Sequence, residues 1–325
     1  MKEDMKENMK EQPNGKSLRD AYMDALFYLA EARPDLFFLD SGVGAACGDR
    51  FGRKYPERCM NFSAAEQNMV LTAAGRALAG RCVYAAAYSS LLVGRAYEQI
   101  RSSVALPKLP VHFASFHAGL TAGAEGATRQ MLEDISLTRN FPGMAIFIPS
   151  DYTSARALLR ETADLKGPSY TRLGRSERPS IYAPDDVSFR VGGGRILREG
   201  DQVTLCACGI MVGEALKAAE VLDQQDISAE VIDCYCLSPF PVRLVLSSLQ
   251  RTGCCATAEE HFLPGGLFET VAGLTVREYP VPVQPVGIKS GFGQSGSTED
   301  LREYYGLTAA QIVSAAVLAW TMRRR

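Results

Sequence analysis

The sequence lacks several patterns that mark other classes of protein. No apolar run approaches the roughly 20 residues that a membrane-spanning helix needs. Residues 1–15 are charged and poor in apolar side chains, so they lack the core of a signal peptide and we expect a disordered tail. The formal net charge of −2 gives no reason to expect nucleic acid or an anionic membrane as partner. We therefore expect a soluble, cytoplasmic protein.

Motifs for metals and nucleotides are also scarce. The nine cysteines include no C-x-x-C pair, and the pairs Cys206/Cys208 and Cys234/Cys236 have the spacing of one strand face. Buried free thiols in a reducing cytosol are therefore expected, rather than disulfides or zinc. In the sequence GVGAACG, which follows an apolar run, the third glycine comes one residue too late for a dinucleotide-binding loop, and no P-loop is present.

What the chain does contain is an alternation of strand-like apolar runs with helical patterns, which is typical of a parallel sheet covered by helices. A length of 325 residues suits two domains. A stretch rich in proline and charge (ERPSIYAPDD) interrupts the alternation, which then restarts. We predict two tandem three-layer α/β domains with mainly parallel sheets, at residues 16–178 and 191–325, joined by a linker at 179–190.

The expected elements follow the same pattern. Strands are predicted at 36–39, 81–88, 110–115, 144–148, 169–173, 203–207, 229–234, 255–259 and 283–288. Helices are predicted at 17–33, 65–79, 96–106, 130–140, after 151, and at 212–222, 242–251 and 267–278, with two more near the C-terminus.

One acidic residue, Glu66, stands at the start of an alanine-rich helix, in the sequence NFSAAEQNM. A carboxylate in a first helical turn is often only favourable with the helix dipole. The flanking sequence instead suggests that the chain buries and aims this group. Because a carboxylate in an apolar niche is costly without a partner, Glu66 is a candidate for binding or catalysis.

Two further clusters lie where strands are expected to end. The glycine-rich loop from residue 117 places His117, Glu125 and Arg129 among glycines that would let backbone approach a ligand closely. The sequence GPSYTRLGR places Arg172 and Arg175 at a strand end, where a guanidinium suits a phosphate or another anion. A surface loop and surface ion pairs are the alternative interpretations.

Taken together, these stretches resemble the C-terminal two-thirds of transketolase, in the form where two chains encode the enzyme. The resemblance runs from about residue 16 to 319 and rests on YPERCMNFSAAEQNM, GRAYEQIR, FHAGLTAGAEGATRQMLEDISLTR, PSD at 149–151, GPSYTRLGR, AEEH at 258–261 and YYGLTAAQIV. It implies a pyrimidine-binding domain, a transketolase C-terminal domain, and thiamine diphosphate as cofactor.

The resemblance also implies residue roles. Glu66 would hydrogen-bond N1′ of the cofactor aminopyrimidine and favour the tautomer that deprotonates the thiazolium ring. Tyr88 would lie against the pyrimidine, although a core tyrosine is the alternative, and Asp40 would lie close to the cofactor. His117 would contact substrate hydroxyls as a catalytic residue. His261 is expected to be structural.

The substrate side departs from the family pattern G-x-D-G-x-T-H, since this chain reads GAEGATR at 123–129. Glu125 replaces the aspartate that contacts a donor hydroxyl, and Arg129 replaces the histidine. We hypothesise that the substrates differ from the usual pentose-phosphate pair and that Arg129 contacts an anionic group. Arg175 and Arg172 match positions near the substrate phosphate.

One family motif is missing. A complete enzyme carries G-D-G, followed by an asparagine, in an N-terminal domain that binds Mg²⁺ and the diphosphate, whereas the sequence GDR occurs here. The resemblance therefore implies that the Mg²⁺ ligands come from another chain. We expect an obligate partner chain and an α2β2 heterotetramer, with the cofactor between the two chains.

Two other interpretations stay open. The same architecture occurs in the beta subunits of two-oxoacid decarboxylases and in deoxyxylulose-phosphate synthase, which release CO₂ instead of transferring a ketol unit between sugars. A non-catalytic partner subunit is the other possibility. The retained Glu66 argues against it, and the altered loop argues for it.

Overall fold

The structure is a computed structural model that describes residues 16–42, 50–175 and 179–323. Its first helix begins after Ser17, which caps it. The Ser17 hydroxyl accepts a hydrogen bond from the backbone N–H of Asp20 at 3.1 Å, and the Asp20 carboxylate accepts one from the Ser17 N–H. This capping box starts α2 (Leu18–Ala32) where the sequence predicts it. Helix α2 packs against α7 (Tyr152–Thr162), which Asp151 caps in the same way.

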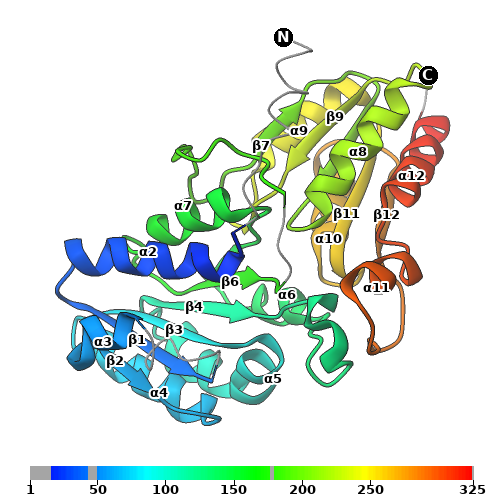
Figure 1. Cartoon of the computed structure of the whole chain (residues 1–325). Coiled ribbons are helices and arrows are strands. Elements are labelled where there is room, and N and C mark those ends of the chain that lie inside the picture. The colour runs from blue at the N-terminus through cyan, green and yellow to red at the C-terminus, as the bar shows by residue number, and fades with distance from the viewer. Residues whose placement is uncertain (1–15, 43–49, 176–178, 324–325) are drawn as a thin grey trace.

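The first sheet has seven strands in the order β10-β5-β6-β4-β3-β1-β2, and all its neighbours pair in parallel except β10 with β5. Its strands are β1 (Leu36–Ser41), β2 (Cys59–Asn61), β3 (Cys82–Tyr88), β4 (Val111–Phe116), β5 (Ala145–Phe147), β6 (Ser169–Leu173) and β10 (Cys236–Ser238). Helices α2 and α7 cover one face, and α4 (Glu66–Leu78) and α5 (Ser89–Gln99) cover the other (Figure 1). Burial on both faces explains why β3 and β4 read as nearly continuous apolar runs.

The second sheet has five strands in the order β12-β11-β8-β9-β7 and is parallel except for the β7 edge. Its strands are β7 (Arg195–Arg198), β8 (Val203–Ala207), β9 (Ala229–Asp233), β11 (Cys255–Phe262) and β12 (Val283–Ile288). Helices α8 (Met211–Asp223) and α12 (Ala309–Met322) pack together against it, as do α9 (Val242–Thr252) and α10 (Leu267–Glu278). Short helices α3 (Arg50–Lys54), α6 (Asp134–Thr138) and α11 (Thr298–Tyr304) complete the described α-helices, and 3-10 helices lie at Pro56–Arg58 and Leu120–Glu125.

The two units share one strand, which the sequence did not indicate. Strand β10 lies in the second half of the chain but pairs antiparallel with β5 of the first sheet. Cys234 and Cys236 therefore do not share a strand face as expected, because Cys234 follows β9 whereas Cys236 lies in β10 of the other sheet. A three-residue strand is too short to show an alternating pattern in sequence.

Two predicted helices differ from the observed ones. The segment expected to be helical at 130–140 contains only α6, because Gln130 is turned toward the preceding loop and Met131 forms a bridge with Gly119. The helix expected at 96–106 begins earlier, at Ser89, and continues past a kink at Ala96 as a π-helical segment, Ile100–Ala105. Its start directly after β3 leaves no polar linker to mark the boundary.

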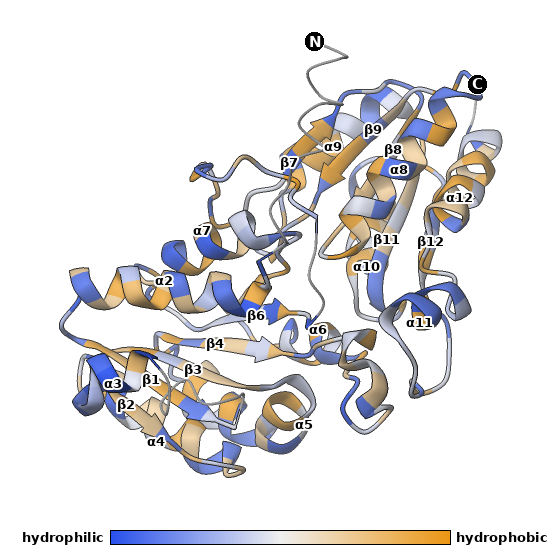
Figure 2. Cartoon of the chain, in the orientation of Figure 1, coloured by the Kyte–Doolittle hydropathy of each residue, from blue (hydrophilic) through white to orange (hydrophobic). Residues whose placement is uncertain are grey.

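The stretch Thr298–Met322 is long and apolar enough to cross a membrane by length and composition alone, which differs from the expectation of no such run. It comprises two separate helices, α11 and α12. The apolar residues of α12, seen in Figure 2, include Ile312, Ala316 and Ala319, which are buried against α8 and the second sheet. One face of α12 is therefore packed against the second domain, whereas Leu318 and Met322 are exposed.

The cysteines follow the expectation with one exception. Seven described cysteines are free and buried: Cys82, Cys206, Cys208, Cys234, Cys236, Cys254 and Cys255. Cys59, in contrast, is disulfide-bonded. The expectation of free thiols throughout was therefore wrong at this position.

Candidate active site

Glu66 is the first residue of α4, and its side chain is completely buried. One carboxylate oxygen, Oε1, accepts a hydrogen bond from the Ser41 hydroxyl at 3.0 Å. The other, Oε2, accepts one from Nη1 of Arg95 at 2.7 Å. Two donors from different elements therefore fix the direction of this carboxylate.

The surroundings of Glu66 differ from the apolar niche expected from sequence. Arg95 lies in α5, and its guanidinium also donates to the carbonyl of Ala64. About half of the Arg95 side chain is exposed, so the ion pair joins a buried anion to a cation at the protein surface. The motif GRAYEQIR contains this arginine, but sequence alone did not link it to Glu66, 29 positions earlier.

Several other candidate residues gather at the same edge of the first sheet. Strands β1, β3, β4 and β6 run in parallel, so their carboxyl ends meet there. Asp40 and Ser41 end β1, Tyr88 ends β3, and His117 follows β4 directly. Arg175 follows β6. This shared edge brings together side chains that are far apart in the sequence.

Tyr88 and His117 form the aromatic part of the site. Their ring centroids lie 4.8 Å apart in an edge-to-face arrangement. The Arg129 guanidinium lies over the Tyr88 ring, 5.7 Å from its centroid. Burial lowers the pKa of His117 below its usual range, although the nearby Glu125 carboxylate opposes that shift. The imidazole is therefore neutral at pH 7.

Residues 117–129, which we call the glycine loop, also bring acidic and basic groups together. Nδ1 of His117 lies 3.6 Å from Oε1 of Glu125. The same oxygen accepts a hydrogen bond from Nη1 of Arg175 at 3.0 Å. The predicted residues His117, Glu125 and Arg175 therefore form one contiguous polar surface beside Tyr88.

Three other predicted residues are buried and do not form part of this polar surface. Asp40 is buried in β1. Arg172 is buried in β6, where its guanidinium contacts both carboxylate oxygens of Asp134 at 2.9–3.1 Å and the carbonyl of Glu260 at 2.9 Å. His261 is buried in β11 and accepts a hydrogen bond from the N–H of Ser136. Arg172 and His261 thus lie between the two sheets.

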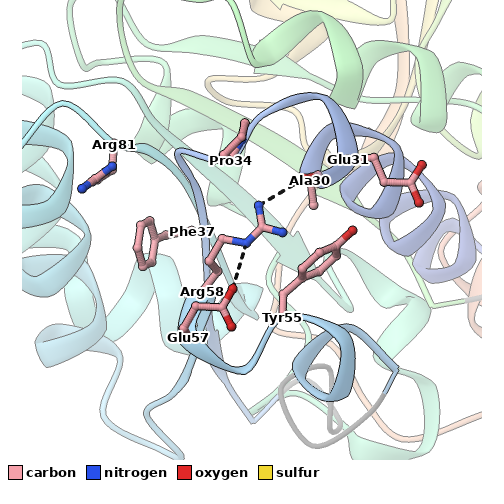
Figure 3. Close-up of a pocket in the computed structure, with 8 residues that line it drawn as sticks. All are labelled: Ala30, Glu31, Pro34, Phe37, Tyr55, Glu57, Arg58 and Arg81. Carbon is pink, nitrogen blue, oxygen red and sulfur yellow. Dashed lines mark hydrogen bonds and ion pairs between the residues drawn. The ribbon is translucent and has the colours of Figure 1, made fainter.

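A hollow of about 620 Å³ lies at the opposite end of the first sheet (Figure 3). Its lining residues are Ala30, Glu31, Pro34, Phe37, Tyr55, Glu57, Arg58 and Arg81. Phe37 stands near the amino end of β1, whereas Ser41 stands at its carboxyl end. The hollow is therefore separate from the site around Glu66.

Fold and site together define a two-domain α/β protein in which carboxylate, aromatic and cationic side chains meet at the carboxyl edge of the first sheet. Family comparison assigns both domains: "Transketolase, pyrimidine binding domain" matches residues 14–180, and "Transketolase, C-terminal domain" matches residues 192–312. The chain belongs to the transketolase family, whose members are thiamine diphosphate-dependent transferases. The resemblance found in the sequence and the predicted fold class are both confirmed.

Individual relatives agree in length as well as in sequence. A putative transketolase C-terminal section from Methanocaldococcus jannaschii is 36% identical, over 91% of this chain and 94% of that protein. A 6-deoxy-6-sulfo-D-fructose transketolase subunit from a Clostridium species is 38% identical, over 92% and 93%. A solved structure described as a split-gene transketolase, an inactive beta4 tetramer, superposes with a TM-score of 0.90 at 40% identity and covers 95% and 100%.

Proposed function

We propose that this chain is the pyrimidine-binding subunit of a two-chain transketolase. With a partner chain, it transfers a two-carbon ketol unit from a ketose to an aldehyde. The observation that carries the proposal is the buried Glu66 carboxylate at the sheet edge, held by Ser41 and Arg95. Such a group is preorganised to meet one polar ring atom of a bound cofactor, because its partners already fix its position.

The residues around Glu66 fit the pyrimidine half of thiamine diphosphate. Each carboxylate oxygen has two lone pairs, so Glu66 can accept a further hydrogen bond beside those from Ser41 and Arg95. The half-buried Tyr88 ring follows Ala87, which pairs with Ser41, and so offers an aromatic face at the same sheet edge; Asp40 precedes Ser41 in β1. When bound, thiamine diphosphate supplies the electron sink for the two-carbon fragment.

The substrate side is assigned to His117, Glu125, Arg129 and Arg175. A neutral imidazole both donates and accepts hydrogen bonds, which suits the hydroxyl groups of a sugar. Arg129 and Arg175 bring two permanent positive charges to the edge, where Arg175 pairs with the Glu125 carboxylate and Arg129 lies over the Tyr88 ring. The site therefore suits a ketose or aldehyde that carries a phosphate or another anionic group.

Arg172 has a different proposed role. Its guanidinium is buried and forms ion pairs with the carboxylates of Asp134 and Glu260. We assign it to the support of the site rather than to contact with the substrate anion.

The other half of the cofactor site is assigned to a partner chain. The relatives that match this chain over nearly their whole length are described as a section and a subunit of transketolase, which supports a divided enzyme. Within residues 16–42, 50–175 and 179–323, no group of three or more His, Cys, Asp or Glu side chains could hold a metal ion. We propose that the partner supplies the Mg²⁺ ligands and that the two chains assemble as an α2β2 heterotetramer.

The experiment mixes this chain with its partner chain, Mg²⁺ and thiamine diphosphate, and measures two-carbon transfer over a panel of phosphorylated and sulfonated sugars. We expect transfer by the mixture and its loss in Glu66→Ala, because that substitution removes the group that faces the cofactor ring. Glu98→Ala, an exposed glutamate in α5, is the matched control and should retain activity. Transfer that survives Glu66→Ala undiminished, or CO₂ release from a two-oxoacid in place of transfer, would contradict the proposal.

A further inference from the structure

The glycine loop of the first domain is held by residues of the second domain. Helix α11 lies beside this loop in Figure 1, and the two are in contact. The backbone N–H of Leu120 donates to Oε1 of Glu260, from β11, at 2.9 Å. Both partners are buried, so water does not compete for this hydrogen bond.

Gln130 forms a second connection, at the end of the glycine loop. Its side-chain nitrogen, Nε2, lies 3.3 Å from the carbonyl oxygen of Gly123 and 3.4 Å from that of Leu120. The same nitrogen donates to the carbonyl oxygen of Gln294 at 2.9 Å. Gln294 belongs to the sequence GFGQSGS at 291–297, which we call the second-domain loop. One buried amide group therefore joins the two loops.

Glycines occupy the points of closest approach between these segments. A Cβ on Gly119 would lie 2.5 Å from the carboxyl carbon of Glu260, and one on Gly126 would lie 2.6 Å from Oγ of Ser295. A Cβ on Gly293 would overlap Oε1 of Gln130. Close contact with the second domain thus accounts for glycines that sequence analysis assigned to ligand approach.

Arg172 holds Glu260 in place. Arg172 donates to its carbonyl at 2.9 Å and lies 3.5 Å from its carboxylate, and Arg172 is held in turn by Asp134. All three side chains are buried. The glycine loop is therefore anchored to an ion-pair network at the domain boundary.

We propose that the second domain acts as a positioning element for the substrate side of the site. Through Glu260, Gln130 and the second-domain loop, it holds the glycine loop so that His117 packs against Tyr88 and Glu125 lies beside His117. The inference rests on the proposed function, since it takes the glycine loop as the surface that contacts the sugar. Glu260 and Gln130 are positioning residues, because each acts through the loop backbone.

The test compares Gln130→Ala with Gln202→Ala, which also removes a side-chain bond to backbone, from Ser228 N–H, but lies far from the glycine loop. Hydrogen–deuterium exchange is measured on the full chain, and transfer kinetics on its complex with the partner. Gln130→Ala should speed exchange in peptides covering 117–129 and lower kcat/KM about 10- to 100-fold, mainly through KM, since small displacements of positioning groups have effects of this size. The control should change neither.

A second variant reaches the same connection from the other domain. Gly293→Ala displaces the Gln130 side chain from outside the core, whereas Gly273→Ala, in α10, adds a methyl group in open space. Faster exchange at 117–129 in Gly293→Ala, with an unchanged melting temperature, supports the proposal. Unchanged exchange in both Gln130→Ala and Gly293→Ala overturns it.

The two proposals fail in distinguishable ways. If the wild-type complex shows no two-carbon transfer, the proposed function fails, whereas the exchange data still report whether the second domain holds the loop. If transfer occurs and KM is the same in wild type, Gln130→Ala and Gly293→Ala, the positioning role fails while the function stands.

Discussion

Arg95 donates a hydrogen bond to Glu66 at 2.7 Å and thereby joins α5 to the start of α4 at the centre of the candidate site. This ion pair offsets part of the cost of burying a carboxylate that has no exposed surface. A ligand that donates a hydrogen bond to this carboxylate must share it with Arg95. The pair is thus both a structural tie and part of the site.

Replacement of Arg95 tests this double role. Arg95→Ala leaves the Glu66 carboxylate buried with Ser41 as its remaining hydrogen-bond donor among those described above. We expect unfolding free energy to fall by about 1–2 kcal/mol, a moderate value because half of the Arg95 side chain is exposed. Denaturant unfolding measures it, and Arg101→Ala, an exposed arginine of the π-helical segment, is the control. Equal stability of Arg95→Ala and wild type contradicts the role assigned to the pair.

Arg172 and Arg175 offer a matched comparison of burial. Arg172→Met leaves Asp134 and Glu260 without their cation in the core, and we expect a loss of about 3–5 kcal/mol in unfolding free energy. Arg175→Met removes an exposed partner of Glu125, so its stability should change by less than about 1 kcal/mol. Its effect should appear in the KM of an anionic substrate. A large stability loss in Arg175→Met would contradict the assignment of a structural role to Arg172 and a substrate-binding role to Arg175.

Arg129 tests the proposed substrate charge. Arg129→His restores the side chain usual in the family and removes a permanent positive charge near Tyr88. We expect the ratio of kcat/KM for an anionic substrate to that for its uncharged analogue to fall about tenfold, since a charge-assisted contact contributes about 1.5–3 kcal/mol. Arg81→His, at an exposed position beside the hollow at the opposite end of the first sheet, is the control. An unchanged substrate preference would contradict the hypothesis.

A buried carboxylate in the second domain predicts a pH dependence of stability. Burial raises the pKa of Asp233 to about 7, although hydrogen bonds from Ser150 and Tyr182 oppose the shift. Between pH 4 and 7 the folded protein therefore keeps a proton on Asp233 that the unfolded chain has released. The free energy of unfolding accordingly falls as pH rises from 4 to 7. Asp233→Asn removes the titration.

The melting temperature of Asp233→Asn minus that of wild type should therefore increase from pH 4 to pH 7 and stay constant above pH 7. Differential scanning calorimetry across this range measures the difference. Asp185→Asn, at an exposed position, should follow wild type throughout. Parallel curves for Asp233→Asn and wild type over the whole range would show that Asp233 does not titrate there.

The sequence predicted the features that depend on local pattern. The helix start at Ser17, the strands β6 and β8, and Glu66 at the first turn of α4 all lie where expected. The parallel order of the strands then explains why Tyr88 and His117 meet, although 29 positions separate them. The family motifs indicated Tyr88 and His117 as site residues but did not predict the contact between their rings.

Features that depend on contact between distant segments were not predicted. Arg95 carries no local mark of its pairing with Glu66, and β10 is too short for a readable alternation. The helical pattern after Gln130 was misleading, because the Gln130 side chain contacts backbone carbonyl oxygens of the glycine loop and of the second-domain loop. The burial of Arg172 between the sheets likewise required the tertiary structure, since an arginine at a strand end is usually exposed.

The central claim is that this chain provides half of a cofactor site. Calorimetric titration of thiamine diphosphate with Mg²⁺ into the chain alone, into its mixture with the partner, and into the same mixture carrying Glu66→Gln tests it most directly. We predict tight binding by the wild-type mixture, no measurable binding by the chain alone at the same concentrations, and at least tenfold weaker binding with Glu66→Gln, about 1.4 kcal/mol. Binding by the chain alone as tight as by the mixture, or unaltered by Glu66→Gln, would contradict the claim.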